Sequence, residues 1–157
     1  MGGQVPTDEE LIGVMTSLPD LDAQLTRRIT LLVYRDIEAA HKQLVEVFGF
    51  AAGPLVRGAD GKAVHGEVYA GDGVIWMHRE APEFKLASPA TLGAATHCMA
   101  VNVDDIDVQF ARVKAAGGDI TKETTVMPYG VREYSVRDCE GGLWSFMEPL
   151  REEVSDE

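Results

Sequence analysis

The pattern of hydrophobic and polar positions divides residues 28–80 into a strand, a helix and three further strands. Residues 28–34, "RITLLVY", are β-branched and aliphatic, which predicts a buried strand. Behind Asp36, a helix-capping residue type, Ile37, Ala40 and Leu44 recur at helical spacing and predict a helix. Extended runs, separated by the turn sequences "ADGK" and "GDG", are expected near residues 52–58, 63–70 and 73–79. The predicted order is βαβββ.

The same order recurs from residue 96 onward. "HCMAVNV" is strand-like, and "DDIDVQFARVKAAGG" predicts a capped amphipathic helix with Ile106, Phe110 and Val113 on one face. Extended segments are expected to follow near residues 119–126, 131–137 and 142–148. The second half is therefore predicted to be βαβββ again.

Direct comparison of the two halves supports an internal repeat. At an offset of 69 residues, Asp36 matches Asp105, Ile37 matches Ile106 and Gly49 matches Gly118. A repeated unit that cannot bury its own sheet face must pack against its twin or against another chain.

The segments that flank the modules differ from them in composition. Thr7 and Glu10 form a capping-box pattern that predicts a short helix ending before Pro19, and prolines with small residues separate the two modules. The expected division is an N-terminal extension (1–27), a first module (28–80), a linker (81–95), a second module (96–150) and an acidic tail (151–157).

Composition and charge narrow the classes of partner. The hydrophobic content of 45% is typical of a folded globular protein. The net charge of −12, from 14 basic and 26 acidic residues, argues against a basic surface for nucleic acid or an anionic membrane. The sequence has no run of transmembrane length, and its first residues lack the basic start and apolar segment of an export signal, so a cytoplasmic location is expected. The expected partner is a small molecule or another protein.

Four motifs, in this order, carry a family resemblance: "LLVYRDIEAAHKQLVEVFGF", "GDGVIWMH", "THCMAVNVDDID" and "YSVRDCEGGLWSF". Their order and spacing over residues 28–150 resemble the vicinal oxygen chelate superfamily, which contains glyoxalase I, extradiol dioxygenases, fosfomycin resistance enzymes and bleomycin-binding proteins. The resemblance implies an α+β fold in which two βαβββ modules form a cupped mixed sheet with helices outside. It also implies a homodimer, because family members commonly pair modules across chains.

The resemblance also implies metal positions that can be compared with this chain. In the enzymes of the family, a divalent metal is held at the start of each module's first strand and by a glutamate in a late strand. His97 matches one position, but Arg28 or Ile29 stands at its counterpart in the first module, and Ser145 replaces the glutamate. A catalytic metal site normally needs about three protein ligands. The inherited metal site is therefore expected to be lost.

Hairpin geometry predicts which side chains share a face. With an even loop at "GDG", His65, Glu67, Tyr69, Trp76 and His78 lie on one face and the neighbouring apolar residues on the other.

An even loop at "DCEG" would put Arg132, Tyr134, Ser145 and Met147 together, with Trp144 and Phe146 in the core. An odd loop or a bulge would exchange these partners.

A lining of aromatic, histidine and arginine side chains suits a planar or amphipathic organic ligand. The candidate ligand contacts are His65, Glu67, Tyr69, Trp76, His78, His97, Tyr129, Arg132, Tyr134 and Ser145. Each histidine has an alternative role as a hydrogen-bonded sheet residue, and Tyr129 has one in shaping its turn.

The leading hypothesis is a small-molecule-binding protein of this superfamily that needs no metal and sequesters an aromatic or amphipathic metabolite or antibiotic. The alternative is a glyoxalase-type lyase or isomerase, or a dioxygenase, in which His97 joins His65, Glu67 or His78 around Zn²⁺, Fe²⁺, Mn²⁺ or Ni²⁺. A third hypothesis is a regulatory module that binds a partner through the N-terminal helix and the acidic surface.

Overall fold

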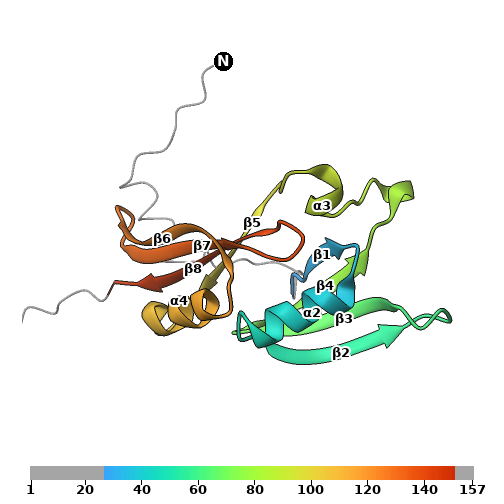
Figure 1. Ribbon diagram of the computed structural model, residues 1–157, viewed down its shortest axis with the longest axis horizontal. Coiled ribbons are helices and arrows are strands. Elements are labelled where there is room, and N and C mark those ends of the chain that lie inside the picture. Colours follow the sequence, from blue (N-terminus) through green and yellow to red (C-terminus); the bar gives the residue numbers. More distant parts are fainter. Residues whose placement is uncertain (1–26, 151–157) are drawn as a thin grey trace, which may run out of the picture.

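The computed structural model describes residues 27–150 and contains the βαβββ order twice (Figure 1). The first module consists of β1 (Thr30–Tyr34), α2 (Ile37–Glu46), β2 (Ala51–Arg57), β3 (Ala63–Ala70) and β4 (Gly73–Arg79). The second consists of β5 (Cys98–Asn102), α4 (Ile106–Ala115), β6 (Asp119–Met127), β7 (Val131–Arg137) and β8 (Leu143–Pro149). Between them lie a 3₁₀ helix, η1 (Pro82–Phe84), and α3 (Pro89–Leu92). The predicted α+β fold is confirmed.

The two modules have the same sheet topology. The first sheet has the strand order β1-β4-β3-β2 and the second the order β5-β8-β7-β6. In the first sheet β1 is parallel to β4, and in the second β5 is parallel to β8. The remaining strand pairs are antiparallel. The order of connections confirms the internal repeat.

The two equivalent helices begin in the same way. The Asp36 carboxylate accepts a hydrogen bond from the Ala39 amide, and the Asp105 carboxylate accepts one from the Val108 amide, both at 3.0 Å. These bonds satisfy amides that have no partner within the helix, so both aspartates are N-caps as predicted.

The proposed match of Gly49 with Gly118 is wrong in backbone conformation. Gly49 has a φ of 87°, a left-handed conformation that favours glycine, and in the second module Gly117 has the corresponding φ of 76°. The loop after α4 therefore places its left-handed glycine one residue earlier than the offset of 69 implies.

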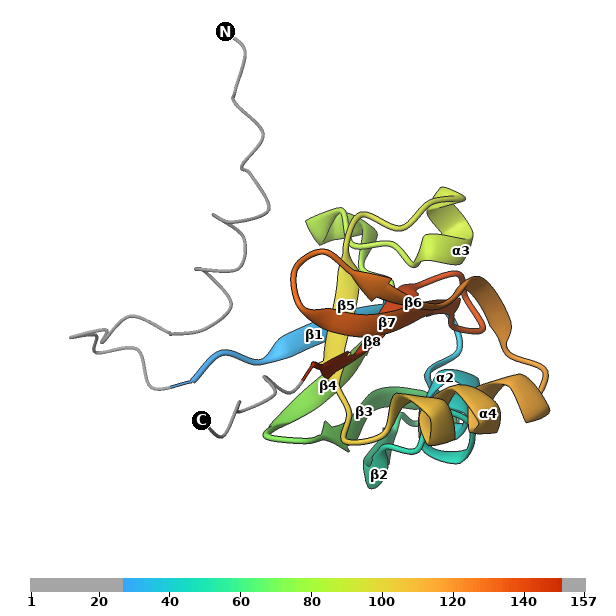
Figure 2. The same ribbon diagram turned by 90° about the vertical axis from the view of Figure 1, so that its left-hand side faces the viewer.

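The two modules share one hydrophobic core. Phe48, which follows α2, packs edge-on against Trp144 and Phe146 of β8, with ring centroids 5.7 and 5.5 Å apart. The side-chain amide of Gln109 in α4 donates to the Phe48 carbonyl oxygen at 2.9 Å, and Arg112 donates to the Glu46 carbonyl oxygen at 3.0 Å. Both views show α2 and α4 side by side (Figures 1 and 2).

This packing gives each sheet two different sides. On the first sheet, Val68 and Met77 are fully buried in the shared core, and on the second sheet Val136 and Phe146 are. The side of each sheet that faces the core is termed its helix face, and the opposite side its open face. Because both helix faces contribute to one core, the two open faces point away from each other within one chain.

The turn between β7 and β8 ties the second sheet to the first module. The buried Asp138 carboxylate accepts hydrogen bonds from the Tyr34 hydroxyl at 2.7 Å and from the Trp144 indole nitrogen at 3.0 Å. The buried Glu140 carboxylate accepts from the backbone amides of Arg35 and Asp36 at 2.8 and 2.9 Å. Burial, followed by the Asp138 charge, raises the pKa of Tyr34 well above its usual value.

Two further findings concern the segments outside the sheets. Within residues 27–150, no helix is long and apolar enough to cross a bilayer. The predicted helix near Thr7 lies outside the described residues.

We predict that Asp138→Asn lowers the free energy of unfolding by about 1.5–3 kcal/mol, because a buried charged acceptor of several hydrogen bonds is lost. Urea unfolding measures this change, and exposed Asp119→Asn serves as the matched control. In a double-mutant cycle with Tyr34→Phe, the two effects should be clearly less than additive. Full additivity would show that the Tyr34–Asp138 hydrogen bond does not link the modules.

Candidate functional site

The first open face carries the side chains that the "GDG" hairpin was predicted to place there. A two-residue turn, in which Gly71 has a φ of 58°, joins the paired residues Ala70 and Gly73. His65 therefore pairs with His78, and Glu67 with Trp76. The predicted pairing of this hairpin is confirmed.

His65, Glu67 and Trp76 form a connected group on this face. The His65 Nε2 atom lies 3.0 Å from the Glu67 Oε1 atom. The His65 ring packs edge-on against Trp76, with ring centroids 5.5 Å apart. Leu31 and Tyr69, on the same face, are 41% and 45% exposed. The face thus offers an aromatic and apolar surface with one polar pair.

The predicted pairing of the second hairpin is wrong. Residues 138–142 form an odd, five-residue loop between the paired Arg137 and Leu143, so Tyr134 pairs with Phe146 and Ser135 with Ser145. Trp144 and Phe146 are buried in the core as predicted. An even loop would have shifted this register by one residue and exchanged the faces.

The corrected register moves two candidate ligand contacts to the helix face. Tyr134 is fully buried, stacked on Phe146 at 5.3 Å and edge-on to Phe110 of α4 at 5.2 Å. Arg132 forms a bidentate ion pair with Asp107 of α4, with the shorter contact at 2.7 Å. Neither side chain lies on the open face, so both are removed from the candidate lining.

The second open face carries side chains that the sequence interpretation left out. Ser145 does lie there, but beside Ser135 instead of Tyr134. Met147 shares this face with Ser145, as predicted, and the register adds its β7 partner Glu133 and Cys98 of β5, which pairs with Leu143. The sequence signal for this register was the five-residue turn "DCEGG" with its two glycines. In the structure, Gly141 of this turn has a φ of 89°.

Glu133 is the centre of a charged group on this face. One carboxylate oxygen accepts a hydrogen bond from the Lys122 Nζ atom, and the other accepts one from the Tyr129 hydroxyl at 2.7 Å. Lys122, Glu133 and Tyr129 are termed the β7 trio. Tyr129 was a predicted ligand contact, whereas Lys122 and Glu133 were not predicted.

Burial, together with Glu133, raises the pKa values of two groups near Glu133, the Tyr129 hydroxyl and the Cys98 thiol. Burial and the hydrogen bond to Glu133 raise the pKa of Tyr129 to about 12. Burial, and secondarily the Glu133 charge, raise the pKa of the Cys98 thiol. Both groups are therefore protonated at neutral pH.

The histidines do not come together as a metal site. His97 is exposed before β5 and lies beside Leu32 and Trp144 at a small cavity between the modules, on the helix-face side. The His78 Nδ1 atom contacts the Arg79 carbonyl oxygen at 2.6 Å. Among residues 27–150, no three histidine, cysteine or acidic side chains are grouped as metal ligands. The donors within residues 27–150 do not fit the divalent metal that the resemblance implies.

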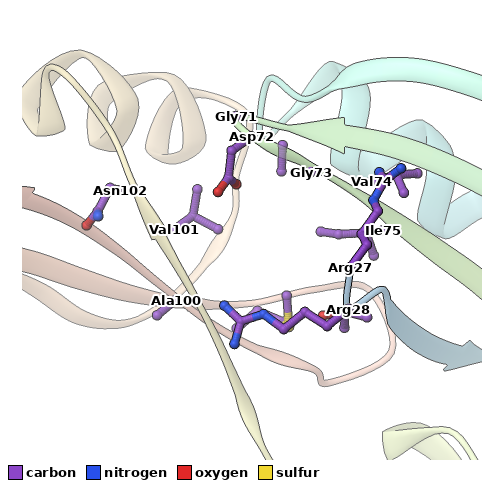
Figure 3. A pocket seen from close by; sticks show the side chains of 13 residues that line it. Arg27, Arg28, Gly71, Asp72, Gly73, Val74, Ile75, Ala100, Val101 and Asn102 are labelled. Atoms are coloured by element: carbon purple, nitrogen blue, oxygen red, sulfur yellow. The ribbon is translucent and has the colours of Figure 1, made fainter. Parts of the chain in front are cut away.

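A larger cavity lies elsewhere, between the modules. It has a volume of about 630 Å³, and its polar side chains include Arg28, Asp72 and Asn102 (Figure 3). Its apolar wall includes Ile75 and Met99. None of the predicted ligand contacts lines this cavity, and it has no aromatic side chain. The open faces, which carry the aromatic and charged groups, remain the candidate site.

Comparison with known proteins identifies the family. A model of the Glyoxalase/Bleomycin resistance protein/Dioxygenase superfamily matches residues 27–146. The chain belongs to this superfamily.

Three relatives illustrate the range of the similarity. An uncharacterized protein of Mycobacterium bovis is 28% identical over 129 residues, which cover 80% of this chain and 85% of the relative. TioX from Micromonospora sp. ML1 is 33% identical with a TM-score of 0.64, covering 80% of this chain and 99% of TioX. TnmS3 from Streptomyces sp. CB03234, described as an antibiotic binding protein, is 17% identical with a TM-score of 0.60, covering 81% of this chain and 99% of TnmS3. The similarity to TnmS3 concerns the fold alone.

We predict that Tyr129 ionises near pH 12 and that Glu133→Gln lowers its pKa towards the usual value near 10. The variant removes the negative charge that opposes the phenolate. Ultraviolet titration of the wild type minus the Tyr129→Phe variant isolates this residue from the other tyrosines. An unchanged pKa in Glu133→Gln would contradict the hydrogen bond between Tyr129 and Glu133.

Proposed function

We propose that the protein binds and sequesters an aromatic or amphipathic small molecule on its open faces, without a metal ion. The observation that carries this proposal is the position of Trp76. Its ring lies on the open face of an interior strand, edge-on to His65 and beside Glu67. An aromatic ring flanked by a few polar groups is the usual composition of a site for a planar organic ligand.

The comparisons support the ligand class in a limited way. TnmS3 is an antibiotic binding protein with the same fold. We extend this to the present chain as a proposal that its ligand is an antibiotic or a related metabolite. The metal-dependent alternative is less well supported, because within residues 27–150 the adjacent donors His65 and Glu67 are not joined by a third metal-ligating side chain.

We also propose that the binding cup is completed in a homodimer. Within one chain the two open faces point apart, so a ligand could contact only one of them. Leu31, Val56 and Tyr69 leave 41–48% of their surface exposed on the first open face. Exposed apolar groups of this kind are typical of a surface that a partner or ligand covers. In the proposed dimer, the first sheet of one protomer and the second sheet of its partner enclose the ligand.

We predict that Trp76→Ala weakens binding of anthracene-2-carboxamide, a planar neutral probe, by about tenfold, because aromatic stacking and apolar burial are lost. Titration calorimetry measures the affinity, and energy transfer from tryptophan to anthracene reports proximity. Phe84→Ala is the matched control, since Phe84 is 75% exposed on η1, which belongs to neither sheet. Equal affinity in Trp76→Ala and wild type would contradict the proposed site.

The metal requirement is tested on the same preparation. The proposal expects protein purified without added metal to bind the probe equally well before and after treatment with a chelator. A stoichiometric transition metal, together with loss of binding on chelation, would favour the metal-dependent alternative instead.

We predict that Leu31→Asp converts the dimer to a monomer, because it places a charge in the proposed interface. Leu31 is 41% exposed in one chain, so the substitution should leave the fold intact. Analytical ultracentrifugation measures the mass, and Leu92→Asp is the control at a 56% exposed leucine of α3. A wild-type monomer at micromolar concentration would contradict the dimer but leave ligand binding open to the Trp76 test.

A further inference from the structure

Glu133 is buried although it lies on an open face. It belongs to β7, an interior strand between β6 and β8, and its side chain is only 9% exposed. Lys122 and Tyr129 cover it and occupy its two carboxylate oxygens. A buried carboxylate without such partners would be strongly disfavoured. The β7 trio is thus a pre-formed polar centre in the floor of the second open face.

The backbone of β6 is irregular where it places Lys122. The pairing of β6 with β7 shifts register between Ile120 and Lys122, and again between Lys122 and Thr125. Such irregularities redirect side chains and are frequent beside functional sites. Lys122 is therefore held over the neighbouring strand by a local departure from regular pairing.

The hydrogen-bonding capacity of the trio defines what it can offer to a ligand. The Lys122 ammonium has three N–H groups, of which one is directed to Glu133 and one to the Met127 sulfur atom at 3.6 Å. The side chain is 38% exposed, so the third N–H is accessible from the open face. Tyr129 has given its only hydrogen to Glu133. The trio thus presents one charged donor.

The charge of this donor is already compensated. A carboxylate ligand at Lys122 would lie close to the Glu133 carboxylate, and an ammonium ligand would meet the Lys122 ammonium, so each would be opposed by a like charge. A neutral carbonyl oxygen accepts the hydrogen bond without either repulsion. The geometry therefore favours a neutral acceptor.

We propose that Lys122 is a specificity-determining residue that recognises a neutral carbonyl oxygen, such as that of an amide or a quinone, on the aromatic ligand. Glu133 is a positioning residue that orients Lys122 and cancels its charge. This inference rests on the proposed ligand-binding function and names the chemical group that the site selects.

Three probes with the same aromatic body test the proposal: anthracene-2-carboxamide, anthracene-2-carboxylate and 2-anthracenylmethylammonium. In the wild type, the carboxamide should bind about tenfold more tightly than either charged probe. Lys122→Met should weaken carboxamide binding by about tenfold, the value expected for a lost hydrogen bond to a charged donor. Lys122→Arg, which keeps the charge and donors, should retain most of the preference. Lys114→Met is the control at an exposed lysine of α4.

Glu133→Gln provides a readout that a structural role would not give. With its counter-charge removed, Lys122 should attract an anion, and the order of affinities should change so that the carboxylate binds more tightly than the carboxamide. Circular dichroism and urea unfolding check that each variant is folded.

The outcomes separate the two proposals. If binding depends on Trp76 but the three probes bind equally well, the role of the trio alone is overturned. The same conclusion follows if Glu133→Gln still prefers the carboxamide over the carboxylate. Failure of all three probes to bind the wild type would overturn the proposed function and the role of the trio with it.

Discussion

The arrangement of the two modules depends on two buried carboxylates in one turn. The Asp138 carboxylate accepts a hydrogen bond from the Tyr34 hydroxyl of β1. The Glu140 carboxylate accepts hydrogen bonds from the backbone amides of Arg35 and Asp36, which precede α2. Buried carboxylates are stable only when hydrogen bonds replace their hydration, and here most of those donors come from the other module or from the turn itself. The turn therefore fixes where the second sheet lies relative to the first strand and helix of the first module.

This attachment determines which surfaces remain for binding. With the turn bound to the first module, α2 and α4 lie side by side, and Phe48 packs against Trp144 and Phe146. The helix faces of both sheets are buried in this common core. Both open faces, with Trp76 on one and Glu133 on the other, then lie on opposite sides of the chain. A ligand that contacts both groups needs a second protomer, which connects the packing of the core to the proposed dimer.

The sequence predicted the fold and half of the site for identifiable reasons. Element order follows from hydrophobic spacing and caps such as Asp36 and Asp105, which act locally. The first hairpin was paired correctly because a two-residue glycine turn fixes its register. The second was not, because one more loop residue exchanges the faces and moves Tyr134 into the core. The contact of Lys122 with Glu133 depends on irregular pairing of β6, which no local pattern encodes.

The second open face also bears on the proposal that this fold binds a ligand without a metal. The resemblance places a metal-ligating glutamate at the position of Ser145, and here the acidic side chain of this face is Glu133, on the adjacent strand. A carboxylate in that position could ligate a cation only by displacing the Lys122 ammonium and the Tyr129 hydroxyl that already hold both of its oxygens. In the proposed function, the acid on this face therefore positions a hydrogen-bond donor. This supports recognition of an intact organic molecule over metal-assisted conversion of one.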